Sequence, residues 1–278
     1  MHNHRSPVLT VTALRAALYK HRLIVTCAVA STAFGLLMVA ATPSPAAAAE
    51  LKLLGPVSLR AIMPDLLAQF EKSSGHKVTV GYATLGAITD RLLKGESAEV
   101  AIVSPAQNED LQKQGKLLPG SRVEVAKVGY TVFVKKGAPK PDISSVDALK
   151  VTLLSAKSIA LGDPAAGGGS GVYLAGLMQR LELAPQINAK TKLFPSGTEV
   201  AEAVAKGDTE IGIGVGSDAK IVPGLDAIPL PAGAQSYSLY VAGIGSDSKQ
   251  VDAAKALIAF LTSPQVKQAL IANGFEPL

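Results

Sequence analysis

The chain has 278 residues, and its 27 Lys and Arg against 22 Asp and Glu give a formal net charge of +5. Four of these basic residues and none of the acids lie within residues 1–49, so residues 50–278 carry 23 minus 22, a net charge of +1. This balance gives no reason to expect nucleic-acid binding. Outside residues 1–49 there is no cysteine and only one histidine, which excludes a tetrahedral zinc site and a Cys-His catalytic pair. We therefore expect neither a metal nor a cofactor.

Residues 1–49 have the order of a secretory signal peptide. A basic segment without acids reaches Arg22, an apolar run covers 23–41, and Pro and small residues fill 42–49. The alanines before Glu50 offer an A-x-A cleavage site, so we expect removal after Ala49. The apolar run is also long enough for an uncleaved membrane anchor. Cys27 lacks the residues that precede a lipoprotein cleavage site. The sequence thus predicts a periplasmic, soluble monomer without a lipid anchor.

Short apolar runs alternate with amphipathic segments after residue 50, which is typical of an α/β fold with mostly parallel strands. The first such series ends near residue 116. Its predicted strands cover residues 51–54, 77–81 and 99–103, and its predicted helices cover 62–73, 87–94 and 109–114. The second series follows the same plan. Its predicted strands cover 158–161, 190–194 and 210–215, and its predicted helices cover 172–181 and 199–206.

Two segments between and after these series, 123–136 and 236–244, are rich in β-branched and aromatic residues. We interpret them as two strands that cross between lobes and form a hinge; the alternative is an ordinary hairpin or sheet edge. Helices at 251–261 and 264–272 are expected to return to the first lobe. The prediction is an α/β protein of two lobes, each a mostly parallel sheet flanked by helices. Lobe 1 would comprise 50–129 and 239–278, and lobe 2 would comprise 130–238.

In open α/β lobes, ligands bind beyond the carboxyl ends of the strands, where helices begin. Five loops fit this description, namely 55–60, 82–86, 104–106, 162–171 and 214–217, and each offers hydroxyls, glycines or both. Such groups suit a small anion, which needs converging donors and little steric bulk. The candidate ligand-binding residues are Ser58, Arg60, Thr84, Gly86, Ser104, Tyr130, Gly169, Ser170, Gly171, Gly216 and Ser217.

Each candidate also has a structural explanation. A Ser or Thr at a helix start can be a simple N-cap, Arg60 can be a solvated surface residue, and Tyr130 can belong to the core. If the cleft is catalytic, its base must be Asp163, Asp218 or Tyr130, although Asp163 is equally suited to capping its own loop. His76 lies at the amino end of its strand, on the side away from the predicted cleft. We assign no catalytic residue.

Several short motifs in this order resemble the molybdate-binding-protein-like family of type II periplasmic binding proteins. They are FEKSSGHKV at 70–78, GESAEVAI at 95–102, GDPAAGGGSG at 162–171, KGDTEIG at 206–212 and NGFEPL at 273–278. The resemblance covers nearly all of 50–278. It implies the two-lobed type II fold, a small anion bound in the interlobe cleft, and delivery of that anion to the membrane permease of an ABC importer.

The resemblance leaves the ligand class open. Ser58 and Thr84 stand where molybdate binders of this family have small hydroxyl residues, but Pro56 and Arg60 depart from that pattern. The family also includes a subgroup that handles small organic carboxylates, with aconitate isomerase among its members, and Arg60 would suit such a ligand. The alternatives are therefore a carrier of a molybdate-like oxyanion or small carboxylate, a periplasmic isomerase of an unsaturated tricarboxylate, or an exported interaction protein with a sealed cleft.

Overall fold

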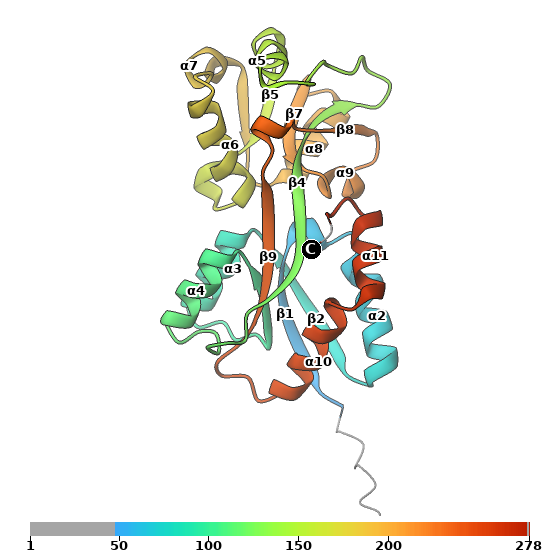
Figure 1. The fold of residues 1–278 in the computed structure, drawn as a ribbon. Helices are drawn as coiled ribbons and strands as arrows, with labels where there is room; N and C mark the ends of the chain where they lie inside the picture. The colour runs from blue at the N-terminus through green and yellow to red at the C-terminus, as the bar shows by residue number, and fades with distance from the viewer. Residues whose placement is uncertain (1–47, 277) are drawn as a thin grey trace, which may run out of the picture. The chain divides into compact units, whose positions relative to one another are not determined.

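The computed structural model describes residues 48–276 and 278, and the expected signal segment up to residue 47 lies outside them. Within the described part, the strands form one nine-stranded sheet in the order β2-β1-β3-β9-β4-β7-β5-β6, with β8 paired to β4. Figure 1 shows two groups of helices, one toward each end of β4 and β9. The chain is thus α/β with two lobes, as predicted. No helix among the described residues is long and apolar enough to cross a membrane.

Lobe 1 is built on three strands, β1 (Glu50–Pro56), β2 (Lys77–Ala83) and β3 (Val100–Val103). Strand β1 pairs in parallel with both β2 and β3. The helices of this lobe are α2 (Met63–Ser74), α3 (Leu85–Leu93), α4 (Pro105–Lys113), α10 (Val251–Leu261) and α11 (Pro264–Ala272). As the sequence predicts, the two C-terminal helices return to this lobe, where Phe260 of α10 packs 5.6 Å from Phe70 of α2, measured between ring centroids.

Lobe 2 repeats this plan with β5 (Ile159–Gly162) paired in parallel with β6 (Thr191–Phe194) and β7 (Ile211–Val215). Strand β8 (Leu225–Pro229) adds an antiparallel neighbour to β4. The helices are α5 (Val146–Ser155), α6 (Gly169–Arg180), α7 (Ala184–Ile187), α8 (Gly197–Lys206) and α9 (Asp218–Ile221).

Strands β4 (Val123–Lys135) and β9 (Tyr237–Ile244) connect the lobes (Figure 1). The first half of β4, up to Gly129, pairs with β9. From Tyr130 onward it pairs with β7 and β8 instead. One continuous strand is therefore shared between the sheet of lobe 1 and that of lobe 2. The apolar core is continuous between the lobes along β4, since Val128, Val132 and Ile213 belong to the same buried cluster as Leu53 in β1.

Local sequence explains most element boundaries. In α2 the buried positions Met63, Leu66, Leu67 and Phe70 recur at helical spacing, and Gly75 ends the helix in the left-handed conformation with φ of 76°. Four elements, α5, α7, β8 and α9, were not predicted from the sequence. Helices α7 and α9 have only four residues each, too few for a periodic pattern. Strand β8 ends in Pro229 and is half exposed, so it lacks the apolar run of a central strand.

A group of charged residues fixes the turn that follows α3. Glu96 accepts two hydrogen bonds from the Arg91 guanidinium, each 2.6 Å long, and lies 2.7 Å from the Lys52 ammonium of β1. These partners, Arg91 foremost, lower the pKa of Glu96 to about 2. Because the pKa is depressed in the folded state, the stabilisation is present above the carboxyl's ordinary pKa of 4.5 and is lost as the pH falls toward about 2.

We therefore expect Glu96→Gln to lower the melting temperature at neutral pH and to have a much smaller effect near pH 2, where about half of wild-type Glu96 is itself protonated. Circular dichroism melts across this pH range measure the difference. Glu124→Gln is the matched control, since the Glu124 carboxylate is exposed and lies 4.0 Å from Arg122. An equal, pH-independent effect of both substitutions would contradict the assigned role of Glu96.

Candidate functional site

A cavity of about 60 Å³ lies where the carboxyl ends of the strands of both lobes meet the crossing strand β9. Its walls come from the ends of β1, β2, β5 and β7, from the starts of the helices that follow strands, and from β9. The lining residues are Pro56, Val57, Ser58, Ala83, Thr84, Leu85, Gly162, Asp163, Gly168, Gly169, Ser170, Gly171, Pro195, Ser196, Gly197, Thr198, Val215, Asp218, Ser238 and Tyr240.

On the lobe 1 side, two hydroxyl residues follow parallel strands. Ser58 lies in the short 3-10 helix η1 (Val57–Leu59) after β1, is 8% exposed, and donates a 2.9 Å hydrogen bond to the Tyr240 hydroxyl. Thr84 follows β2 and caps α3, where its Oγ1 accepts from the Ala87 N–H at 3.2 Å. The Thr84 hydroxyl also donates to the Ala166 carbonyl of lobe 2 at 3.2 Å. Both residues thus combine a structural role with a place on the cavity wall.

On the lobe 2 side, helices α6 and α8 begin at the cavity. The N-cap of α6 is Gly168, which offers no side-chain acceptor, so the first N–H groups of this helix are left for other partners. Helix α8 begins after Ser196, which forms a capping box with Glu199, and its first residues Gly197 and Thr198 line the cavity. The N-termini of α3, α6 and α8 therefore bring partial positive charge to one place.

Strand β9 contributes Ser238 and Tyr240 to the same wall. The Ser238 hydroxyl lies 2.9 Å from the hydroxyl of Tyr130 in β4, and the Tyr130 ring stacks on Tyr173 at 4.4 Å between centroids. Burial raises the pKa of both Tyr130 and Tyr240. These phenols consequently keep their protons at neutral pH and act as neutral hydrogen-bonding groups.

The charged groups that line the cavity are two acids, Asp163 and Asp218, and the described lining residues include no Lys, Arg or His. Asp163 caps the 3-10 helix η2 (Pro164–Ala166) by accepting from the Ala165 N–H at 2.8 Å. Asp218 is 2% exposed and accepts from the Val215 N–H at 3.3 Å and from the Thr198 hydroxyl at 3.4 Å. Burial raises the pKa of Asp218 to about 7, against the opposing effect of these two hydrogen bonds.

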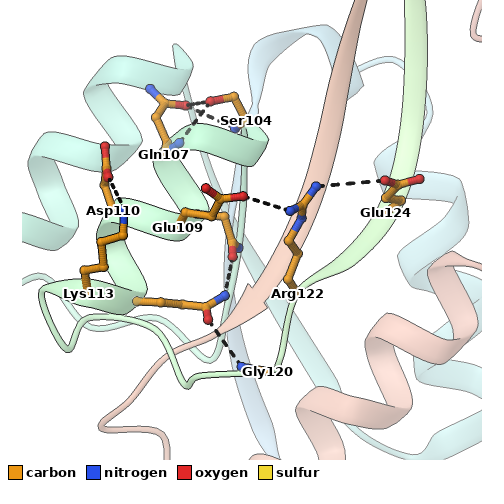
Figure 2. Close-up of polar contacts among 10 residues, drawn as sticks. Ser104, Gln107, Glu109, Asp110, Lys113, Gly120, Arg122 and Glu124 are labelled. Atoms are coloured by element: carbon orange, nitrogen blue, oxygen red, sulfur yellow. Dashed lines mark hydrogen bonds and ion pairs between the residues drawn. The ribbon is translucent and has the colours of Figure 1, made fainter.

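Five of the eleven residues predicted from the sequence lie together on this wall, namely Ser58, Thr84, Gly169, Ser170 and Gly171. The other six do not line the cavity. Arg60 is exposed at the end of η1, and Ser217 is buried beside Asp218. Tyr130 does not line the cavity, but its hydroxyl lies 2.9 Å from the hydroxyl of Ser238, which does. Ser104 caps α4 together with Gln107 (Figure 2).

The remaining two predicted residues, Gly86 and Gly216, lie at backbone contacts between the lobes. The Gly86 N–H donates to the Gly167 carbonyl at 3.0 Å, and a Cβ on Gly86 would lie 2.8 Å from the Gly167 Cα. A Cβ on Gly216 would lie 3.0 Å from the carbonyl oxygen of Gly274, which precedes the C-terminal residues. Glycine thus permits close approach of the two lobes at both places.

Three lining residues, Ser196, Gly197 and Thr198, were not predicted from the sequence, although they follow the strand predicted at 190–194 and obey the rule that identified the other loops. Ser238 and Tyr240 were not predicted either, because residues within a hinge strand follow no helix-start rule. Among the described residues, no group of three or more His, Cys, Asp or Glu could hold a metal ion.

Residues 51–276 match the family described as bacterial extracellular solute-binding protein. The chain belongs to this family. Its fold is that of the molybdate-binding-like, type II solute-binding proteins. A molybdate-binding protein of Azotobacter vinelandii has a solved structure that superimposes with a TM-score of 0.68 at 21% identity, covering 82% of this chain and 99% of that one. The sulfate-binding protein SubI of Mycobacterium tuberculosis gives a TM-score of 0.68 at 19% identity, covering 83% of this chain and 87% of that one.

Two characterised relatives resemble this solute-binding protein in sequence. Aconitate isomerase of a Pseudomonas species is 33% identical over 255 residues, which cover 88% of this chain and 95% of the relative. The molybdate-binding protein ModA of Azotobacter vinelandii is 28% identical over 238 residues, covering 83% and 91% of the two chains. The family is therefore shared with proteins named for binding and with one named for catalysis.

We expect Gly86→Ala to disfavour the closed arrangement of this solute-binding protein, because the added Cβ would collide with the Gly167 backbone. Overpacking of this kind costs about 1–3 kcal/mol, which shifts the population of the closed form by about fivefold or more. Small-angle scattering should show a larger radius of gyration than for wild type. Gly176→Ala in α6 is the control, since its Cβ would meet only the end of the Arg180 side chain at 3.5 Å. Identical scattering of the two variants would show that the contact does not hold the lobes together.

Proposed function

We propose that this chain is the solute-binding component of an ABC-type importer and that it holds a small tetrahedral oxyanion through neutral donors. The observation that supports this most directly is the composition of the cavity wall. Hydroxyls and helix starts surround the cavity, and no cationic side chain is among the described lining residues. The proposed contacts are Ser58, Thr84, Gly169, Ser170, Gly171, Ser196, Gly197, Thr198, Ser238 and Tyr240.

Neutral donors suffice for such a ligand. A hydrogen bond to a charged group contributes about 1.5–3 kcal/mol net, more than one between neutral partners. The starts of α3, α6 and α8 add partial positive charge without a counter-ion that would need desolvation. A fixed set of donors can therefore replace the hydration shell of the oxyanion when the lobes close.

The size of the cavity favours an oxyanion over a tricarboxylate. A buried water molecule needs about 10–15 Å³ of cavity volume. A cavity of about 60 Å³ therefore takes only a few non-hydrogen atoms. A tetrahedral oxyanion has five such atoms, whereas drug-sized ligands occupy pockets of about 300–1,000 Å³. A tricarboxylate would need a wider separation of the lobes and would place several negative charges beside Asp163 and Asp218.

A second candidate function is isomerisation of a small unsaturated tricarboxylate. Two observations favour it: the 33% identity with aconitate isomerase, and a buried carboxyl in the cavity, Asp218, whose pKa of about 7 suits a general base. In this mechanism Asp218 would remove a proton from the carbon next to the double bond and return it at the far end of the allylic system. Against it stands the absence of a cation among the described residues of the cavity wall.

Calorimetry with molybdate, sulfate, citrate and aconitate separates the two functions. For the carrier we expect tight binding of an oxyanion, and Ser58→Ala should weaken it by about 1 kcal/mol, roughly fivefold in Kd, through loss of one hydrogen-bonding group. Ser73→Ala is the matched control, because Ser73 lies near the end of α2 and bonds only to the Phe70 carbonyl. Arg60→Ala should leave oxyanion affinity unchanged and would weaken a carboxylate that pairs with the guanidinium.

The same protein incubated with aconitate tests the enzyme directly. Interconversion of the cis and trans isomers, followed by proton NMR and abolished in Asp218→Asn, would overturn the carrier in favour of the isomerase. Binding of none of the four anions would contradict both functions.

We also propose that the protein acts in the periplasm, with the residues before the described part serving as an export signal. The predicted cut after Ala49 would remove a residue of the folded lobe. Ala49 is 3% exposed, its N–H donates to His76 Nδ1 at 3.1 Å, and its carbonyl accepts from the Lys77 N–H at 2.8 Å. A cut after Ala48 satisfies the A-x-A rule equally well, with Ala46 and Ala48, and keeps these contacts.

We therefore expect the exported protein to begin with Ala49 and not with Glu50. Intact-mass spectrometry of protein purified from the periplasm distinguishes the two forms by the mass of one alanine residue. His76→Phe, which keeps the packing against Phe70 but removes the acceptor, should lower the melting temperature of the Ala49 form. An exported protein that begins with Glu50, or one that retains the signal, would contradict this assignment.

A further inference from the structure

We propose that anion binding at this site is coupled to the uptake of one proton by Asp218, so that Asp218 makes the affinity depend on pH. The inference rests on the proposed anion-binding function and adds a regulatory residue to it. An acid is unexpected in the wall of an anion site. The burial and the contacts of Asp218 determine whether its carboxyl group is protonated when an anion is bound.

The sequence makes room for this carboxyl group. Asp218 is the first residue of α9 and lies between the start of α8 and the end of β7. A side chain at Gly197 would collide with the Asp218 carboxylate, and a Cβ at Gly214 would lie 3.2 Å from its Oδ2. Only small residues at these two positions allow the carboxyl group to reach the cavity wall and accept from Val215 and Thr198.

No positive charge compensates Asp218 in the described part of the chain. It forms no ion pair there, and its two hydrogen-bond donors are neutral. On the crossing strands, Tyr240 is the titratable group whose pKa responds to the charge of Asp218, and Tyr130 acts on Tyr240 in turn. Asp163 lies on the same cavity wall. Helix α9 packs against α8, β7 and β8. The other charged residues on these four elements are Lys220 on α9, Glu199, Glu202 and Lys206 on α8, and Asp226 on β8. None of these contributes to the pKa of Asp218.

An oxyanion and an ionised Asp218 would be like charges in a site with little water, and they would repel strongly. Protonation removes this repulsion and turns the carboxyl group into a donor for the ligand. Burial already raises the pKa of Asp218 to about 7 before any anion is present, and an anion beside it raises this pKa further. Below about pH 7 the proton is in place before binding. Above it, a proton must be taken up with the anion.

The experiment is calorimetric titration of the full exported protein with molybdate, and separately with sulfate, between about pH 6 and about pH 9. Both probes keep their charge over this range. The dissociation constant should be flat below about pH 7 and should rise by up to tenfold per pH unit above it. Asp218→Asn should abolish this dependence and bind more tightly than wild type at the highest pH. Asp252→Asn, at an exposed carboxylate on α10, should titrate as wild type does, and Asp163→Asn should keep the slope.

A measurement on wild type alone guards against misfolding of the Asn variant. The heat of binding above pH 8, compared in buffers of different ionisation enthalpy, should give one proton taken up per anion bound. Zero protons, or a pH slope unchanged in folded Asp218→Asn, would overturn the coupling while leaving the anion carrier intact. Binding of neither anion at any pH would instead overturn the proposed function, and the coupling with it.

The melting temperature without ligand reports on Asp218 independently. Because its pKa is raised in the folded state from 3.8 to about 7, the unfolded chain releases this proton first as the pH rises. Wild type should therefore lose stability relative to Asp218→Asn between about pH 4 and about pH 7 and should show a constant difference above that range. A difference that does not change with pH would contradict a buried, titrating Asp218 and overturn the coupling.

Discussion

The change of hydrogen-bonding partner along β4 is the constraint on which the rest of the structure depends. Up to Gly129 this strand belongs with β9, and from Tyr130 it belongs with β7 and β8. Because the backbone is continuous across the change, β4 carries the hydrogen bonding of one sheet from lobe 1 into lobe 2. The hydroxyls of Ser238 and Tyr240 lie on β9 at this level. The strands that connect the lobes therefore also supply part of the cavity wall.

The second organising feature is that the cavity wall is built from helix starts and hydroxyls, with no Lys, Arg or His among its described lining residues. Three helices of nine to twelve residues begin at the cavity, and hydroxyls fill the positions between their N–H groups. Such a wall contains no flexible cation that must lose rotamer freedom or hydration when the lobes close. Glycines serve the same backbone arrangement, since Gly86 against Gly167 and Gly216 against Gly274 let the two lobes approach closely through backbone.

Much of the fold follows from the sequence because strands and helices here have strong periodic patterns. Four predicted strands agree with β1, β2, β3 and β4 within a few residues. They are 51–54, 77–81, 99–103 and the crossing segment 123–136. The rule that ligands lie beyond strand ends selected Ser58, Thr84 and Ser170, and all three line one cavity. The same rule also selected Ser104, which follows a strand but whose side chain forms the capping box of α4 with Gln107. Such cases depend on tertiary contacts that the sequence does not show, and Arg60 is exposed and does not line the cavity. The lobe boundaries and the ligand contacts themselves stay predictions.

Asp218 shows why a shared fold does not fix a shared activity. A carboxyl group buried in this wall must be neutral when an oxyanion is bound, yet the same group, ionised in a cavity opened for a larger substrate, is placed to remove a proton. The two functions thus differ in how far the lobes close and in which protonation state the ligand selects, not in which residues line the site. A small, fully charged ligand favours closure and a protonated Asp218. A larger ligand with an acidic C–H bond favours a more open cleft, in which water stabilises the ionised carboxylate.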